Sequence, residues 1–168
     1  NPALRNGKAF RQGNAGTVFA TNPDEAAAIL RICGVDQSDL PRSNRSSSVS
    51  GSRSRNWWSF HIDGKEWLSD PLKKGDTDSW GCNAKAKRRD FGLIYATKPV
   101  SALVGVLVTA SNARGYEDAG QPFVCDMKCR VVFKKPLTLN EMKKDPELRS
   151  ETLVQQEFQT MFGPPLIE

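Results

Sequence analysis

The stretch Ser79–Val108, SWGCNAKAKRRDFGLIYATKPVSALVGVLV, is the part of the sequence that says most about the fold. It contains the apolar segment Phe91 to Thr97 and all but the last residue of a second one, Ala102 to Thr109, and each has the length of a strand. The Lys98-Pro99 step between them is a turn signal that would break a helix. We therefore expect two adjacent antiparallel strands.

A lone tryptophan and a basic run precede these strands. The run Asn83 to Arg89, NAKAKRR, contains good helix formers, with Asn83 as a possible cap and basic residues in the last turn, where they oppose the helix dipole. This pattern predicts a short helix, with Trp80 just outside its start and beside its free backbone N–H groups.

Upstream, the sequence predicts an accessory region, residues 1–55, and a main domain, residues 56–168. Asn22 to Cys33 has the cap, the early proline and the acidic first turn of a helix, and Val18 to Ala20 hints at a short strand. The Ser/Arg-rich segment Pro41 to Arg55 is either a flexible linker or an arm that gains order against phosphates. Both interpretations can hold together.

The main domain is predicted to open with the strand Asn56 to Ile62. Alternation places Trp57 and His61 on one face of this strand and Trp58 on the other, so one of the two tryptophans should be core and the other can face a cleft. Trp57, Trp58, Trp67 and Trp80 lie within 24 residues of one another. This local density suggests an aromatic pocket.

Downstream, a polar loop, Ser111 to Pro122, carries one aromatic residue, Tyr116. A long amphipathic strand, Phe123 to Lys134, should follow it, and Thr138 with Glu141 fits the capping box of a short helix. Alternation puts these residues on one face of the long strand: Phe123, Cys125, Met127, Cys129, Val131 and Phe133. Its two cysteines then act as small core residues.

Composition narrows the possible functions. The net charge of +5 and the pI of about 9.1 allow a polyanionic partner. The sequence has no apolar run of membrane-spanning length and no signal peptide, so we expect a soluble, cytoplasmic protein without a membrane partner. Because it begins at Asn1 and not at methionine, we also expect it to be part of a longer protein.

Catalysis and metal binding are not expected. Four dispersed cysteines and the single histidine, His61, do not make a zinc pattern, and no cofactor motif is present. No nucleophile, nucleotide-binding or metalloprotease motif occurs, and His61 with Asp63 lies at a strand end, only two residues apart. We expect a binding domain, and a hydrolase is a remote alternative.

The order W-G, a short Ala/Lys/Arg-rich helix, a strand ending in Tyr-Ala-Thr and then A-L-V-G-V-L-V resembles the centre of EVE domains and the related YTH domains of the PUA superfamily. Residues 135–156, KPLTLNEMKKDPELRSETLVQQ, resemble the segment that closes many EVE domains. The matches run from about Trp57 to the C-terminus. This resemblance implies an α+β fold, a PUA-like, twisted and mostly antiparallel β-barrel with flanking helices.

The resemblance also implies a site. In YTH domains the tryptophan that matches Trp80 forms one wall of a cage around a methylated base, and the strand end at His61 to Asp63 lies beside that base. Asp63 stands where YTH domains commonly have an amide, which leaves the identity of the base open. No tryptophan follows the central strands, so Tyr116, Trp57 or Trp58 must supply the second wall. The residues assigned to base binding are Trp80, Ser79, Asp63, His61, Trp57, Trp58 and Tyr116.

We therefore expect the chain to recognise a modified base that is flipped out of nucleic acid, DNA rather than RNA. It would be the specificity module of a modification-dependent restriction protein whose nuclease or NTPase lies in a further domain. The residues expected to contact phosphates are Asn83, Lys85, Lys87, Arg88, Arg89, Arg53 and Arg55. The alternatives are an RNA reader of the N6-methyladenosine type and a protein-interaction module whose tryptophans are core.

Overall fold

The structure is a computed structural model that describes residues 19–21, 23–40, 55–115 and 123–155 of the 168-residue chain. The predictions for Arg53, Tyr116, most of the Ser/Arg-rich segment and the C-terminal tail lie outside these residues.

One sheet of seven strands forms the centre of the fold, with the order β1-β2-β4-β5-β7-β3 and with β6 beside β7. The strands are β1 (Phe19–Thr21), β2 (Trp57–Ile62), β3 (Thr77–Gly81), β4 (Phe91–Ala96), β5 (Ala102–Thr109), β6 (Arg114–Gly115) and β7 (Phe123–Thr138). Among the described strands, β2 and β4 pair in parallel and the other pairs are antiparallel. The predicted pairing of the two central strands and the largely antiparallel sheet are confirmed.

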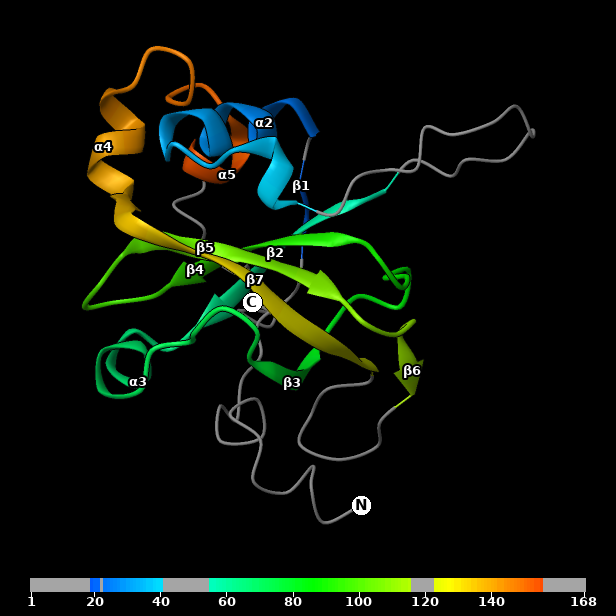
Figure 1. The fold of residues 1–168 in the computed structure, drawn as a ribbon. Coiled ribbons are helices and arrows are strands. Elements are labelled where there is room, and N and C mark those ends of the chain that lie inside the picture. The colour runs from blue at the N-terminus through cyan, green and yellow to red at the C-terminus, as the bar shows by residue number, and fades with distance from the viewer. Residues whose placement is uncertain (1–18, 22, 41–54, 116–122, 156–168) are drawn as a thin grey trace, which may run out of the picture.

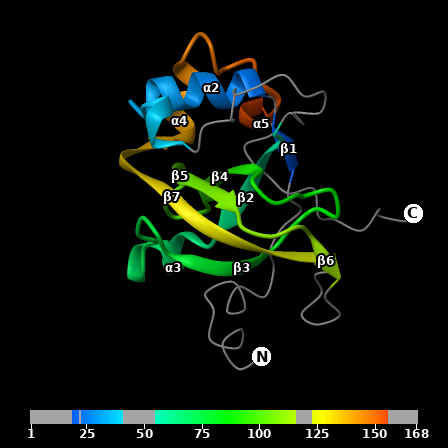
Figure 2. The same cartoon turned by 45° about the vertical axis from the view of Figure 1, so that its right-hand side comes forward.

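The sheet curls into a half-barrel (Figures 1 and 2). Both views place three helices together on one side of it, α2 (Pro23–Ile32), α4 (Leu139–Lys144) and α5 (Thr152–Gln155). The short helix α3 (Gly64–Ser69) lies on the other side, near β3. The protein is therefore a mixed α+β protein, as predicted.

Each face of the sheet packs into its own core. On the outer face, helix residues such as Ile29 and Met142 pack with Leu93, Leu103 and other strand residues. Inside the curl, three tryptophans are buried with aromatic and aliphatic neighbours: Trp58, Trp67 and Trp80. The predicted alternation of β2 is confirmed, because Trp57 packs with the outer core and Trp58 with the inner one.

The prediction that β7 presents one continuous face is wrong. Cys125, Met127 and Cys129 belong to the inner core, but Phe133 belongs to the outer core and Val131 packs against it. Between Val106 and Leu107 of β5 the register moves by two residues on β7, which leaves Arg130 as the extra residue of a bulge. Because the alternation of side chains restarts after the bulge, the residues that continue the series beyond Cys129 face the outer core instead of the inner one.

The N-terminal helix is confirmed as α2, and the capping box of Thr138 and Glu141 begins α4. β1 pairs with β2, and α2 supplies Ala26, Ile29 and Leu30 to the outer core. The division of the chain at residue 55 stays a prediction, but residues on both sides of it share one sheet and one core.

The predicted helix at 83–89 is wrong, because this stretch forms consecutive turns. Backbone amides that would bond to carbonyl groups within a helix donate to side chains instead. The Lys87 amide donates to the Asp90 side chain at 2.9 Å, and the Arg88 amide donates to the Asn112 side chain at 2.9 Å. Arg89 has a φ of 74°, which an α-helix does not allow. Trp80 lies on β3, and the basic run that follows it does not begin a helix.

Candidate functional site

The basic turn, residues 83–89, is fixed to the core by the side chain of Asp90. This carboxylate is 1% exposed and accepts hydrogen bonds from the Trp58 indole N–H at 2.9 Å and from the Lys87 amide at 2.9 Å. The Asp90 amide donates to the Thr109 hydroxyl at 2.9 Å, and that hydroxyl donates to the Lys87 carbonyl. The turn therefore has one defined conformation, and its four basic side chains are exposed: Lys85, Lys87, Arg88 and Arg89.

A second segment, residues 109–114, braces the turn from the side. The Asn112 side chain accepts the Arg88 amide, and the Ala113 amide donates to the Ala86 carbonyl at 2.9 Å. The Arg89 amide donates to the Thr109 carbonyl at 2.9 Å. The basic turn thus lies directly against the segment that leads into β6.

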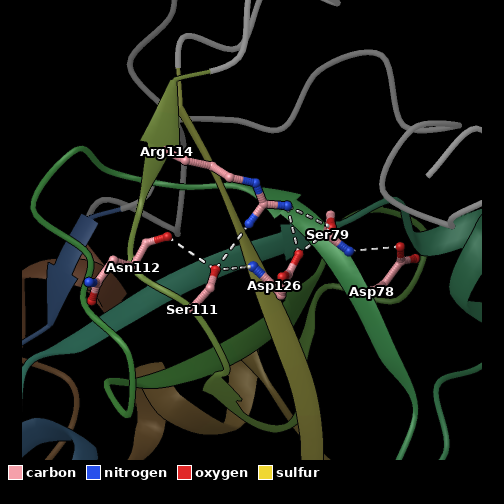
Figure 3. Close-up of polar contacts among 6 residues, drawn as sticks. All are labelled: Asp78, Ser79, Ser111, Asn112, Arg114 and Asp126. Atoms are coloured by element: carbon pink, nitrogen blue, oxygen red, sulfur yellow. Dashed lines mark hydrogen bonds and ion pairs between the residues drawn. The ribbon is translucent and has the colours of Figure 1, made fainter. Parts of the chain in front are cut away.

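Ser111 and Arg114 of that segment form a polar cluster with Ser79 of β3 and Asp126 of β7 (Figure 3). The Ser79 hydroxyl donates to Asp126 Oδ1 at 2.6 Å, and Arg114 Nη2 donates to the same oxygen at 2.8 Å. Arg114 Nη1 donates to the Ser111 hydroxyl at 3.1 Å, which also accepts the Asp126 amide at 2.9 Å. Hydrogen bonds from Arg114 and Ser79 lower the pKa of Asp126 below its usual range, so this carboxylate stays ionised at neutral pH.

Ser79 and Trp80 point to opposite sides of β3. Ser79 pairs with Asp126 in the outward-facing cluster, whereas Trp80 pairs with Cys125 and faces the interior. Trp80 is 4% exposed and meets Phe60 edge-on, with ring centroids 6.1 Å apart. A base can stack on this indole only after the side chains that cover it have moved.

The other predicted aromatic residues divide between the two faces. The indole of Trp58 is 4% exposed and bonded to Asp90, which makes it a core anchor. Trp57 is partly exposed and stacks on Phe91, with centroids 4.8 Å apart, and the guanidinium carbon of Arg55 lies 5.0 Å from the Phe91 ring centroid. Arg55 thus lies by Phe91, two residues after the end of the basic turn, and burial and then repulsion from Arg89 lower its pKa.

His61 and Asp63 are not close partners of Trp80. His61 lies against Tyr95 of the outer core, and burial lowers the pKa of its imidazole to about 4. Asp63 is exposed and caps α3 by accepting the Lys65 amide at 2.9 Å and the Glu66 amide at 3.0 Å. Among the residues that the structure describes, the predicted base-binding side chains therefore do not assemble into one exposed cage.

Several residues of the site were not predicted from the sequence: Asp90, Ser111, Asn112, Arg114 and Asp126. The sequence does mark Asp126 as unusual, because it is an acidic residue in the apolar part of a long strand. Its partners depend on the pairing of β3 with β7 and of β6 with β7, which no local pattern indicates.

Among the residues that the structure describes, no group of three or more histidine, cysteine or acidic side chains is placed to hold a metal ion, and no disulfide joins Cys33, Cys82, Cys125 or Cys129. In the same part of the chain, no helix has the length and apolar character needed to cross a membrane.

Comparison with known proteins finds solved structures that are similar to this chain in fold. No family model matches the chain, and no curated protein matches it. The solved structure of Rpa0253 from Rhodopseudomonas palustris is 21% identical, with a TM-score of 0.51 over 62% of this chain and 81% of that one. PSPTO5229 from Pseudomonas syringae is 15% identical, with a TM-score of 0.49 over 62% of this chain and 87% of that one. The likeness to Rpa0253 supports the curled α+β fold and carries no function.

Proposed function

We propose that this chain is a nucleic-acid-binding module with a PUA-like fold of the EVE and YTH type. It recognises a modified base, methylated in the simplest case, that is flipped out of DNA. It acts as the specificity module of a larger modification-dependent restriction protein. The observation that carries this proposal is the basic turn, which is rigidly held and lies beside the polar cluster.

Phosphate contact is the best-supported part of the proposal. Four exposed cations on one turn attract a polyanion, and each contact releases counterions from the nucleic acid. The hydrogen bonds that its backbone amides donate to Asp90 and Asn112 hold the turn in place before it binds, so little ordering entropy is lost on binding. Arg55, beside Phe91, can extend the same basic surface.

Base recognition rests on the resemblance to EVE and YTH domains. A flipped base gains about 1–3 kcal/mol for each aromatic stacking contact and loses a few kcal/mol of unstacking energy. Trp80 follows Ser79 of the polar cluster along β3, but it is covered. Base reading therefore requires the interior around Trp80 to open, and it must be tested separately from phosphate contact.

Fluorescence polarisation with matched DNA and RNA oligonucleotides tests the phosphate step. The variant Lys85→Ala/Lys87→Ala/Arg88→Ala should bind at least about tenfold more weakly than the unchanged chain and have a shallower salt dependence. The control Lys73→Ala/Lys74→Ala/Lys144→Ala removes the same charge from exposed residues elsewhere and should lose much less. Equal losses in both variants would mean that only net charge matters and that the turn is no site.

The base step is tested with oligonucleotides that carry no modification, N6-methyladenine, 5-methylcytosine or 5-hydroxymethylcytosine. We expect one modification to bind at least about tenfold more tightly, which is about 1.4 kcal/mol. Because Trp80 is core, Trp80→Phe is the suitable variant: it keeps an aromatic ring but offers a smaller stacking face, so it should reduce the preference, and its melting temperature shows whether the fold is retained. Equal binding of all oligonucleotides would rule out base reading, and preference for RNA would support the RNA reader.

A second candidate is a protein-interaction module, and the burial of the tryptophans favours it. Trp58, Trp67 and Trp80 are all at most 8% exposed, as expected if they only stabilise the core. If no oligonucleotide binds at concentrations up to about 10⁻⁴ M, where even non-specific binding is normally seen, this second function replaces the first.

A further inference from the structure

We infer that Arg114 is a phosphate-binding residue and that Asp126 and Ser79 position it. The inference rests on the proposed nucleic-acid function and deepens it, because it extends the phosphate contact from the basic turn across β6. Neither residue type nor spacing in the sequence indicates this role for Arg114.

The geometry holds the guanidinium of Arg114 in one orientation. Its two terminal nitrogens donate to Asp126 at 2.8 Å, to Ser111 at 3.1 Å and to Ser79 at 3.4 Å, so both ends of the planar group are fixed (Figure 3). A guanidinium has five N–H donors, and these three contacts leave donors for an anion. The side chain of Arg114 is 41% exposed, so the cluster does not enclose it.

Hydrogen bonds join the segment that carries Arg114 to the basic turn. In Figure 3 the Ser111 hydroxyl is hydrogen-bonded to both Asn112 and Arg114. The side chain of Asn112 also accepts the Arg88 amide. The bracing segment therefore sets the positions of Arg88 and Arg114 together. A nucleic-acid strand that contacts the basic turn can continue to Arg114 with its next phosphates.

Asp126 orients Arg114 but also repels an incoming anion. The direction in which Asp126→Asn changes the affinity therefore shows which of the two effects is larger. If Asp126 only contributes negative charge, Asp126→Asn should raise the affinity for oligonucleotides. If Asp126 positions Arg114, the same variant should bind about threefold more weakly although it gains positive charge. Ser79→Ala removes one oxygen that holds Arg114 without changing charge, and it should weaken binding in the same direction.

The contact itself is tested by Arg114→Ala and Arg114→Lys. We expect Arg114→Ala to weaken binding about tenfold for every oligonucleotide, modified or not, and to reduce the salt slope by about one. Arg114→Lys keeps the charge but not the planar fork, so it should lose at least about threefold. The matched control is Arg31→Lys, which changes another exposed arginine–carboxylate pair, Arg31 with Glu147, on α2.

The outcomes separate this inference from the function on which it rests. If the basic-turn variant loses binding while Arg114→Lys behaves like Arg31→Lys, the proposed function stands and the role of Arg114 is refuted. A rise in affinity for Asp126→Asn would refute the positioning role. If neither the basic turn nor Arg114 matters, the inference fails together with the proposed function. Melting temperatures of all variants should stay within about 2 °C, which shows that the fold is retained.

Discussion

The carboxylate of Asp90 joins the interior of the half-barrel to the basic turn on its surface. It accepts the indole N–H of Trp58 and the backbone amides of Lys87 and Asn56, the last at 3.2 Å. A buried carboxylate with several donors is stable only while those donors remain, and the donors in turn need the carboxylate. One side chain thus fixes the position of the residues proposed to bind phosphate.

We predict that Asp90→Ala lowers the free energy of unfolding by about 3 kcal/mol, because it leaves buried donors without their acceptor. Urea denaturation followed by tryptophan fluorescence measures the loss. Asp63→Ala is the control, since it removes an exposed helix cap and should lower the free energy of unfolding by about 1 kcal/mol. A loss for Asp90→Ala no larger than that of the control would contradict the anchoring role.

Arg89 allows a test of backbone conformation within the same turn. Its φ of 74° is unfavourable for a residue with a Cβ and neutral for glycine. We predict that Arg89→Gly keeps or raises the free energy of unfolding, by up to about 1 kcal/mol. Arg88→Gly removes the same charge where the backbone does not require glycine, so it should lower stability. Urea midpoints compare the two, and equal losses would show that the turn does not impose this conformation.

The prediction for Trp80 shows that neighbouring residues alone do not determine which way a strand residue faces. A tryptophan beside a basic run suggests an exposed binding wall, and the order of residues supports that interpretation. Whether Trp80 or Ser79 faces outward depends on the partner strand, because Trp80 pairs with Cys125 and Ser79 with Asp126. That register is set by chain more than 40 residues away, so no window around Trp80 contains it.

Among the strands and helices, patterns with a local cause were predictable. The period-2 alternation of β2 and the capping box of α4 needed only neighbouring residues, and both are confirmed. The bulge at Arg130 in β7 has no local signal, because it arises from the pairing with β5. The turns at 83–89 replaced a predicted helix because Asp90 and Asn112 compete for its amides.

Two buried groups in α2 and β2 should make stability depend on pH in opposite directions. Burial and then Glu151 raise the pKa of Glu25 to about 7, so its contribution to stability is complete below its unfolded pKa of 4.5 and is lost as pH rises to about 7. Burial lowers the pKa of His61 to about 4, so stability instead increases as pH rises from about 4 to 6.5. Between about pH 5 and 6.5 the two slopes oppose each other.

We therefore predict that the free energy of unfolding of the unchanged chain varies little across this range. Glu25→Gln should leave the histidine slope, so stability should increase with pH by up to about 1.4 kcal/mol per unit. His61→Phe should leave the opposite slope, with stability decreasing as pH rises. Urea denaturation at pH 5.0, 5.8 and 6.5 measures both variants. If both show the same slope as the unchanged chain, neither group has the shifted pKa.

Across the fold, one sheet separates two cores that cannot form independently. The outer core contains Ile29 and Leu30 of α2 packed with Leu93 of β4 and Met142 of α4, so it combines residues from both predicted parts of the chain. β1 also covers the edge of β2, which would otherwise present unpaired backbone groups. Composition alone indicated a boundary near residue 55, because it reflects the Ser/Arg-rich segment and not the packing on either side.

We predict that a chain of residues 56–168, without β1 and α2, fails to fold stably, because it exposes the outer face of the sheet and the edge of β2. It should bind the dye ANS and lack a cooperative urea transition, whereas the full chain unfolds cooperatively. The control is the full chain with a protease site placed within residues 41–54 and then cleaved. The two pieces should stay together, since packing and strand pairing join them without the covalent link. If residues 56–168 alone unfold with the same urea midpoint as the full chain, α2 is a separate accessory element, and the boundary predicted from composition is the physical one.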